Sequence, residues 1–160
     1  DKKSWDASIP EDKYFDELFR VSKNQIIWGG NYFPLPLTKS WIFWDKNVPK
    51  GVSFADGELA WTSFDKTLIK AKIPYSGFQG MYDGGKIHPT QKPVALYKWL
   101  LNQYGGGCEN ILDTHLGSGS IAIACHEYQF NLTACELDPD YYQKAMKRIN
   151  NHKSQIKIAI

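Results

Sequence analysis

Apolar side chains recur along the first half of the chain at spacings typical of one helix and several short strands. Ser8 and Glu11 have the spacing of a capping box, so we expect a helix behind them. Its apolar face would consist of Tyr14, Phe15, Leu18 and Phe19. Apolar and aromatic runs typical of strands cover residues 24–28, 40–44 and 58–64. Residues 71–87 hold four glycines and one proline, which predicts a loop.

The second half of the chain predicts a unit of strand, helix and strand. Pro93 suits the first turn of a helix, which the glycines at 105–107 would end. A buried strand is expected at 110–113, followed by a glycine-rich turn into a helix and by a second strand at 132–137. Asp138-Pro139 then has the residue types of a helix N-cap and first helical position. The two strands should therefore run parallel.

Composition places the chain among globular proteins. Hydrophobic residues make up 42% of the 160 residues and charged residues 22%, which excludes intrinsic disorder and collagen-like sequences. No apolar run approaches the roughly 20 residues that span a bilayer, so a membrane protein is excluded. Three cysteines without CxxC or zinc-ligand spacing indicate buried reduced thiols of a cytoplasmic protein and no metal site. A net charge of +2 neither requires nor forbids nucleic acid as a partner.

The residues that indicate chemistry stand where the strand at 110–113 turns into a helix. Asp113 ends the strand, and Gly117 and Gly119 let the backbone approach a ligand at the amino end of the helix. Glu136 stands at the end of the next strand, where a carboxylate can accept hydrogen bonds from ribose hydroxyls. This layout favours a cofactor that contains a nucleoside. The alternative is a glycine turn of an ordinary α/β protein.

The type of cofactor follows from the charge at the tip of the first strand. Ala122 stands where a dinucleotide site has its third small residue, so spacing alone leaves NAD open. A phosphate-binding Gly-Lys-Ser/Thr triplet is absent from the sequence. Asp113 would repel a pyrophosphate and attract a cation. We therefore expect S-adenosylmethionine, which carries a sulfonium, an ammonium and a ribose.

Three segments of the chain carry a resemblance to a known family. Residues 88–93 (HPTQKP), 113–120 (DTHLGSGS) and 136–141 (ELDPDY) resemble motifs X, I and II of the DNA methyltransferases that act on exocyclic amines. These enzymes make N6-methyladenine or N4-methylcytosine. Motif I usually reads Asp-Pro-Phe-x-Gly-Ser-Gly-Thr, so Thr114 and His115 depart from it.

The resemblance implies the fold and its organisation. It implies an α/β fold of the class I S-adenosylmethionine-dependent methyltransferases, a Rossmann-like sheet with helices on both faces that is incomplete at the N-terminus. Residues 1–160 would form a single domain. Within it, residues 1–70 would hold strands and a helix that follow the catalytic motif, 71–87 a short recognition loop, and 88–160 the cofactor-binding half.

The resemblance also implies the cofactor contacts. Thr90 and Lys92 would contact the methionine carboxylate, Asp113 the methionine ammonium, Glu136 the ribose and Leu137 the adenine. The full set of implied cofactor-binding residues is Thr90, Lys92, Pro93, Asp113, Leu116, Gly117, Ser118, Gly119, Ser120, Glu136 and Leu137.

The catalytic motif of the family is missing from these 160 residues. The family's chemistry uses an (Asp/Asn/Ser)-Pro-Pro-(Tyr/Phe) segment, and the nearest string, residues 138–141, belongs to the ribose-binding strand and its helix. We therefore assign no catalytic residue and expect an upstream segment or a partner chain to supply this motif. The alternatives are a non-catalytic remnant that binds cofactor or DNA, and an NAD-dependent oxidoreductase.

Double-stranded DNA is the partner that the resemblance implies, and a homodimer stays open. The best candidates for the substrate side are Gly29, Gly30, Asn31 and Tyr32, because they follow a strand at its carboxyl end. Candidates for stacking on a base are Trp28, Tyr32, Trp44 and Trp61, with burial in the core as the alternative. Because the loop at 71–87 is short, we expect a short or loose recognition site.

Overall fold

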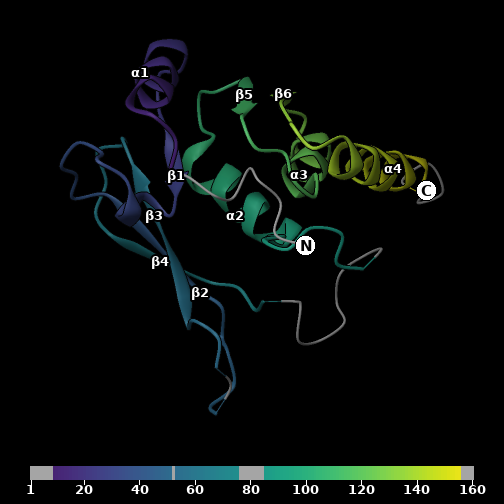
Figure 1. Ribbon diagram of the computed structural model, residues 1–160, viewed down its shortest axis with the longest axis horizontal. Helices are drawn as coiled ribbons and strands as arrows, with labels where there is room; N and C mark the ends of the chain where they lie inside the picture. The colour runs from purple at the N-terminus through teal and green to yellow at the C-terminus, as the bar shows by residue number, and fades with distance from the viewer. Residues whose placement is uncertain (1–8, 52, 76–84, 156–160) are drawn as a thin grey trace. The chain divides into compact units, whose positions relative to one another are not determined.

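The computed structural model describes residues 9–51, 53–75 and 85–155, and the chain forms two compact units (Figure 1). Unit 1 covers residues 1–74 and unit 2 covers residues 75–160. Each unit is described by itself. Over the described ranges, the structure contains no helix that is both long and apolar enough to cross a membrane.

Unit 1 contains a four-stranded mixed sheet. Its strands are β1 (Ile26–Trp28), β2 (Trp41–Asp45), β3 (Gly57–Thr62) and β4 (Ile69–Lys72), in the order β1-β3-β2-β4. Strand β3 is antiparallel to both β1 and β2, whereas β2 and β4 are parallel. The three strands expected in this half are therefore confirmed, with ends that differ by one or two residues.

Strand β4 corrects the prediction of a loop over 71–87, because residues 71 and 72 belong to this strand. Ala71 is buried against β2, while Lys70 and Lys72 on either side of it are exposed. This alternation of buried and exposed residues is typical of a half-buried edge strand. The strand was missed because it has only four residues and its buried side chain is a small alanine, which gives a weak hydrophobic signal. The glycines farther along, at 77, 80 and 84, lie outside the described residues.

Aromatic side chains form the core of unit 1. Helix α1 (Asp12–Val21) buries Phe15, as the helical stripe predicted, while Ser8 of the expected capping box lies outside the described residues. Trp44 and Trp61 are almost fully buried. Their indole N–H groups donate to the carbonyl oxygens of Ile73 and Pro36, at 2.7 Å each. Both tryptophans are thus core residues with satisfied polar atoms, as the alternative to base stacking held.

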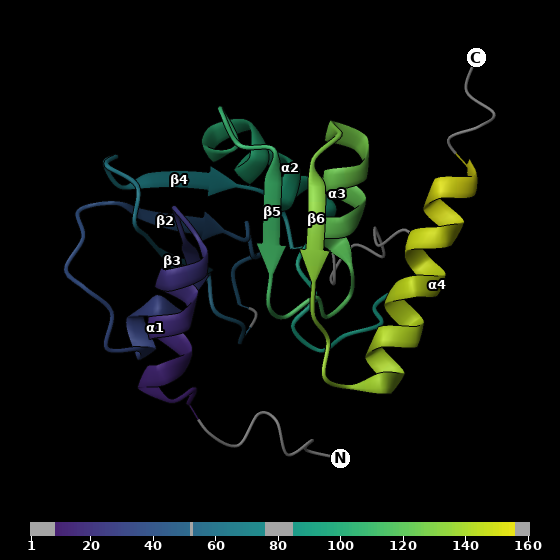
Figure 2. The same cartoon turned by 90° about the horizontal axis from the view of Figure 1, so that it is seen from above.

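Unit 2 contains the predicted strand, helix and strand. Its elements are α2 (Val94–Tyr104), β5 (Asn110–Asp113), α3 (Ser120–Tyr128), β6 (Asn131–Ala134) and α4 (Pro139–Gln155). Strands β5 and β6 are parallel neighbours, in register from Asn110 with Asn131 to Asp113 with Ala134, and both point the same way in Figure 2. The second strand is shorter than expected, since it ends at Ala134 instead of residue 137.

Helices α2 and α3 pack together around a small apolar cluster. Leu101, Ala124 and Cys125 are its buried members. The partly buried residues packed against it are Val94, Tyr97, Ile111, Ile121, Phe130 and Leu132. Cys125 is buried as expected, but Cys108 and Cys135 are exposed, so the expectation of buried thiols is wrong for these two.

Candidate functional site

Asp113 and Glu136 lie close together because backbone pairing continues beyond the ends of β5 and β6. The amide of Cys135 donates to the carbonyl of Asp113 at 2.9 Å, and the amide of Leu116 donates to the carbonyl of Cys135 at 2.8 Å. These bonds hold the residue before Glu136 directly beside Asp113. The two carboxylates therefore share the carboxyl end of a parallel strand pair, where α/β proteins bind ligands.

The carboxylate of Glu136 connects the glycine bend to the start of α4. Its Oε2 accepts from the amide of Gly117 at 2.7 Å, and its Oε1 accepts from the amide of Asp138 at 3.0 Å. Each oxygen of an ionised carboxylate has about two acceptor positions, so each can accept one more hydrogen bond. Glu136 is thus held in a fixed orientation with acceptor capacity to spare.

The Asp113 carboxyl group is partly buried at the strand tip. Burial raises its pKa, and the nearby negative charge of Glu136 raises it further. The amide of His115, which donates to Oδ1 at 3.0 Å, and the positive charges of His115 and Lys92 act in the opposite direction. A cation next to this group would offset the cost of its burial.

The two glycines of the bend serve different purposes. Gly117 has φ of +54° and Gly119 has φ of +73°, so both adopt the left-handed conformation that glycine tolerates best. A Cβ at Gly117 would be 3.6 Å from His88 Nδ1, an ordinary contact. A Cβ at Gly119 would be 2.9 Å from Ile149 Cδ1 on α4. Gly119 therefore also lies close against α4, where an added Cβ would displace the Ile149 side chain.

Replacing Gly119 with alanine is expected to lower the free energy of unfolding by roughly 2 kcal/mol, because left-handed strain and contact with Ile149 add up. Gly107→Ala is the matched control. Gly107 has φ of +75° but no heavy atom within 4 Å of its would-be Cβ, so only the strain of roughly 1 kcal/mol remains. Urea denaturation of both variants measures the difference. Equal losses would show that packing on α4 does not depend on Gly119.

Arg148 on α4 holds the bend from the other side. Its Nη1 donates to the carbonyl of Ser118 and to Oγ of Ser120, at 2.9 Å each. Both serines are buried, and their Oγ atoms are 3.1 Å apart. The hydrogen bonds of Ser118 and Ser120 therefore serve the bend itself, and Arg148 is a supporting residue of the bend that the sequence analysis did not assign.

The segment that resembles motif X is a tight turn held by Gln91. This buried side chain accepts from the amide of Ile87 at 2.9 Å and donates to the carbonyl of Gly85 at 3.4 Å. The turn leads into Pro93, which precedes α2 in an extended conformation. Thr90 is exposed and Lys92 is partly buried. Gln91 was also missed, because nothing in its local sequence distinguishes it from a surface glutamine.

The remaining cofactor candidates differ in exposure. Leu116 is buried, so it supports the bend from within. Leu137 is 89% exposed, which is unusual for a leucine and leaves its side chain available to a ligand. The structure thus brings Asp113, Gly117 and Glu136 into one polar cluster. The next residue, Leu137, presents an exposed apolar side chain.

The four substrate candidates lie in unit 1, directly after β1. The amide of Gly29 donates to the carbonyl of Leu59 at 2.8 Å, and a single 3-10 turn, η2 (Gly30–Tyr32), follows. Gly30 is buried, whereas Asn31 and Tyr32 are exposed, Tyr32 to 74%. Tyr32 therefore offers an aromatic ring to solvent, while Gly30 belongs to the packing of the unit.

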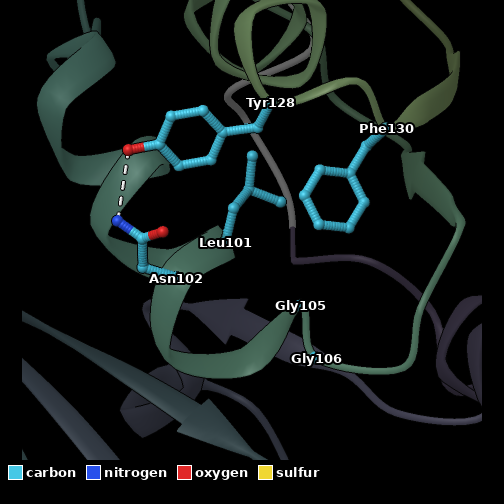
Figure 3. A pocket seen from close by; sticks show the side chains of 6 residues that line it. All are labelled: Leu101, Asn102, Gly105, Gly106, Tyr128 and Phe130. Carbon is cyan, nitrogen blue, oxygen red and sulfur yellow. Dashed lines mark hydrogen bonds between the residues drawn. The ribbon is translucent and has the colours of Figure 1, made fainter.

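A cavity of about 390 Å³ lies elsewhere in unit 2 (Figure 3). It is lined by Leu101, Asn102, Gly105, Gly106, Tyr128 and Phe130. These residues come from the carboxyl ends of α2 and α3 and from the residue before β6, so the cavity is at the amino end of the strands. Asn102 Nδ2 donates to the Tyr128 hydroxyl across it at 3.1 Å. The cavity is therefore separate from the cluster at Asp113 and Glu136.

Comparison with protein families supports the resemblance found in the sequence. The family model for N6/N4 enzymes, described as DNA methylase, matches residues 2–147. This match covers most of both units and includes all three motif segments.

Individual relatives match shorter parts. The type II methyltransferase M.HpaI of Haemophilus parainfluenzae is 29% identical over 66 residues, which are 41% of this chain and 21% of that enzyme. The crystal structure of the M1.HpyAVI–SAM complex superposes with a TM-score of 0.50 and 26% identity, covering 68% of this chain and 60% of that one. The match thus spans about a fifth of M.HpaI. The expected α/β fold class of the methyltransferases is confirmed by the structural likeness.

Proposed function

The chain belongs to the N6/N4 DNA methylase family, and from this premise we propose that it binds S-adenosylmethionine and takes part in methyl transfer to DNA. The observation that carries the proposal is the arrangement of Asp113 and Glu136 at the ends of adjacent parallel strands, with Glu136 bonded to the bend at Gly117. The SAM complex of M1.HpyAVI supports the same cofactor.

The residues of unit 2 fit the chemical groups of this cofactor. Glu136 has acceptor capacity left for ribose hydroxyls, because each of its oxygens accepts only one backbone amide in the described structure. Asp113 is a partly buried acidic group suited to an ammonium, and the positive charge of Lys92 acts on this region. Leu137 presents apolar surface for an adenine ring. When bound, the cofactor supplies an electrophilic methyl group.

The acceptor in this proposal is the exocyclic amine of adenine (N6) or cytosine (N4) in double-stranded DNA. The protein's part is to position the amine in line with the methyl group. A polar group of the protein also accepts a hydrogen bond from the amine N–H. Tyr32 has an exposed ring for stacking on a base, with Gly29, Gly30 and Asn31 beside it in the chain. We also propose a cytoplasmic location, as is typical of this family in bacteria.

The polar acceptor of the reaction is not assigned to these residues, because the 160 residues hold no (Asp/Asn/Ser)-Pro-Pro-(Tyr/Phe) segment. We propose that an upstream segment or a partner chain provides it, and that both units belong to one methyltransferase domain. The missing segment also favours a second candidate, a protein that binds cofactor or DNA without catalysing transfer.

Calorimetry on the 160-residue chain tests the cofactor. We expect S-adenosylhomocysteine to bind and NADH not to bind, because Asp113 repels a pyrophosphate. Binding of NADH alone would replace the proposal with an oxidoreductase. A second assay uses tritiated S-adenosylmethionine and double-stranded DNA, and we expect no transfer by this chain alone. Transfer by the 160-residue chain would contradict the proposal that the catalytic segment lies outside these residues. Transfer by a longer chain only would reject the non-catalytic candidate.

A further inference from the structure

His88 touches each of the three segments that make up the cofactor cluster. Its Nδ1 lies 3.3 Å from the amide nitrogen of Thr90 and 3.1 Å from the Thr90 hydroxyl. Its ring meets the ring of Tyr141, on the first turn of α4, edge-on at 4.4 Å between centroids. It also lies against the bend, since Nδ1 would be 3.6 Å from a Cβ at Gly117.

The contact with Thr90 fixes which nitrogen carries the proton. A backbone N–H is always a donor, so Nδ1 must accept from the amide of Thr90. The ring is then neutral and carries its proton on Nε2, and the Thr90 hydroxyl can donate to the same Nδ1. A proton on Nδ1 would set it against the amide N–H of Thr90, donor against donor, and would break that bond.

The charges around His88 come from its own segment and from the elements packed against it. Burial lowers the pKa of His88 most strongly, and the positive charges of Lys92 and Lys86 on its own segment lower it too. Glu136 and Asp138, at the end of β6 and the start of α4, raise it. The net direction is downward, so the neutral form that the geometry requires is also the form present near pH 7.

We propose that neutral His88 is a positioning residue, which fastens the Thr90–Lys92 turn onto the Gly117 bend and the first turn of α4. This inference rests on the proposed cofactor site and adds a pH-sensitive contact to it. His88 itself needs no contact with the cofactor. It orders the segment whose Thr90 and Lys92 would bind the methionine end, so protonation of His88 weakens cofactor binding from a distance.

The tautomer can be measured without any cofactor. Long-range proton–nitrogen NMR correlation on the 160-residue chain at pH 7.5 should show an unprotonated Nδ1, and titration should give a midpoint below the ordinary value of about 6.5. A protonated Nδ1 at pH 7.5, or a titration midpoint above about 6.5, would overturn the contact between His88 and Thr90, with or without cofactor binding.

Two substitutions at His88 separate positioning from a general structural role. Asparagine places its Oδ1 close to where Nδ1 lies, so His88→Asn should keep the Thr90 bond and bind S-adenosylhomocysteine within about threefold of the unchanged protein. His88→Ala lacks the acceptor and should bind about tenfold more weakly. His126→Asn on α3, an exposed histidine outside the cluster, is the matched control and should bind like the unchanged protein.

The pH profile gives the second readout. Affinity of the unchanged protein for S-adenosylhomocysteine should fall more steeply than that of His88→Asn as the pH drops below about 6.5, because only the former gains a proton on Nδ1. Parallel profiles, or equal binding by the alanine and asparagine variants, would overturn the positioning role. If the unchanged protein does not bind while NMR shows the expected tautomer, the proposed function falls and only the structural contact stands.

Discussion

Replacing Glu136 with glutamine is expected to weaken binding of S-adenosylhomocysteine by about a hundredfold, which corresponds to roughly 3 kcal/mol. The carboxylate accepts from two backbone amides on opposite oxygens, those of Gly117 and Asp138. A glutamine has one oxygen and one amide group, so one of these donors would face another donor. Charge-assisted bonds to the ribose hydroxyls would be lost at the same time.

Calorimetry and thermal unfolding should be measured together for this variant. Glu109→Gln is the matched control, because Glu109 is exposed just before β5 and the same change of charge there should leave binding unchanged. A Glu136→Gln variant that binds within threefold of the unchanged protein would remove the ribose contact from the proposal. A loss of binding without any loss of stability would assign the effect to the ligand and not to the bend.

Gly30→Ala is expected to lower the free energy of unfolding of unit 1 by roughly 3 kcal/mol, through overpacking. An added Cβ would be 2.4 Å from Cβ of Trp61 and 3.2 Å from Cδ1 of Leu35. Trp61 has little freedom to move, since its indole bonds to the carbonyl of Pro36 and its ring contacts Phe19 at 5.8 Å between centroids.

The control for this substitution is Gly106→Ala. Gly106 has no heavy atom within 4 Å of its would-be Cβ and has no positive φ, so the change should be neutral or slightly stabilising. Urea denaturation measures both variants. If Gly30→Ala were as stable as the control, the backbone at η2 would have to shift easily. With the expected result, lost activity in this variant would reflect packing and would be no evidence for a substrate contact at Gly30.

Features that rest on local sequence could be predicted correctly. The helix after Asp138-Pro139 is an example, because an aspartate N-cap acts within one turn. Its Oδ1 accepts from the amides of Asp140 and Tyr141, at 2.9 and 3.1 Å. The same holds for the parallel pair β5 and β6, which a glycine bend and a short helix connect. The proximity of Asp113 and Glu136 follows from that topology alone.

Features that depend on distant contacts could not be predicted. Arg148 acts on Ser118 from thirty residues away, and no local pattern distinguishes it from an exposed arginine of an amphipathic helix. Gln91 is buried because of how its own turn folds, although glutamine is ordinarily an exposed residue. The serines of the bend were assigned to the cofactor by resemblance. In the structure, Arg148 donates hydrogen bonds to both of them, and these bonds stabilise the bend.

The unequal distribution of tryptophans gives each unit a different optical signal. Trp28, Trp41, Trp44 and Trp61 all lie in unit 1, and Trp99 on α2 is the one described tryptophan of unit 2. Intrinsic fluorescence therefore reports mainly on the unit that holds Tyr32, and among the described residues the half with Asp113 and Glu136 contributes through Trp99. Loss of structure around the cofactor cluster would change only a small share of the tryptophan signal, so circular dichroism of its helices is the more suitable probe there.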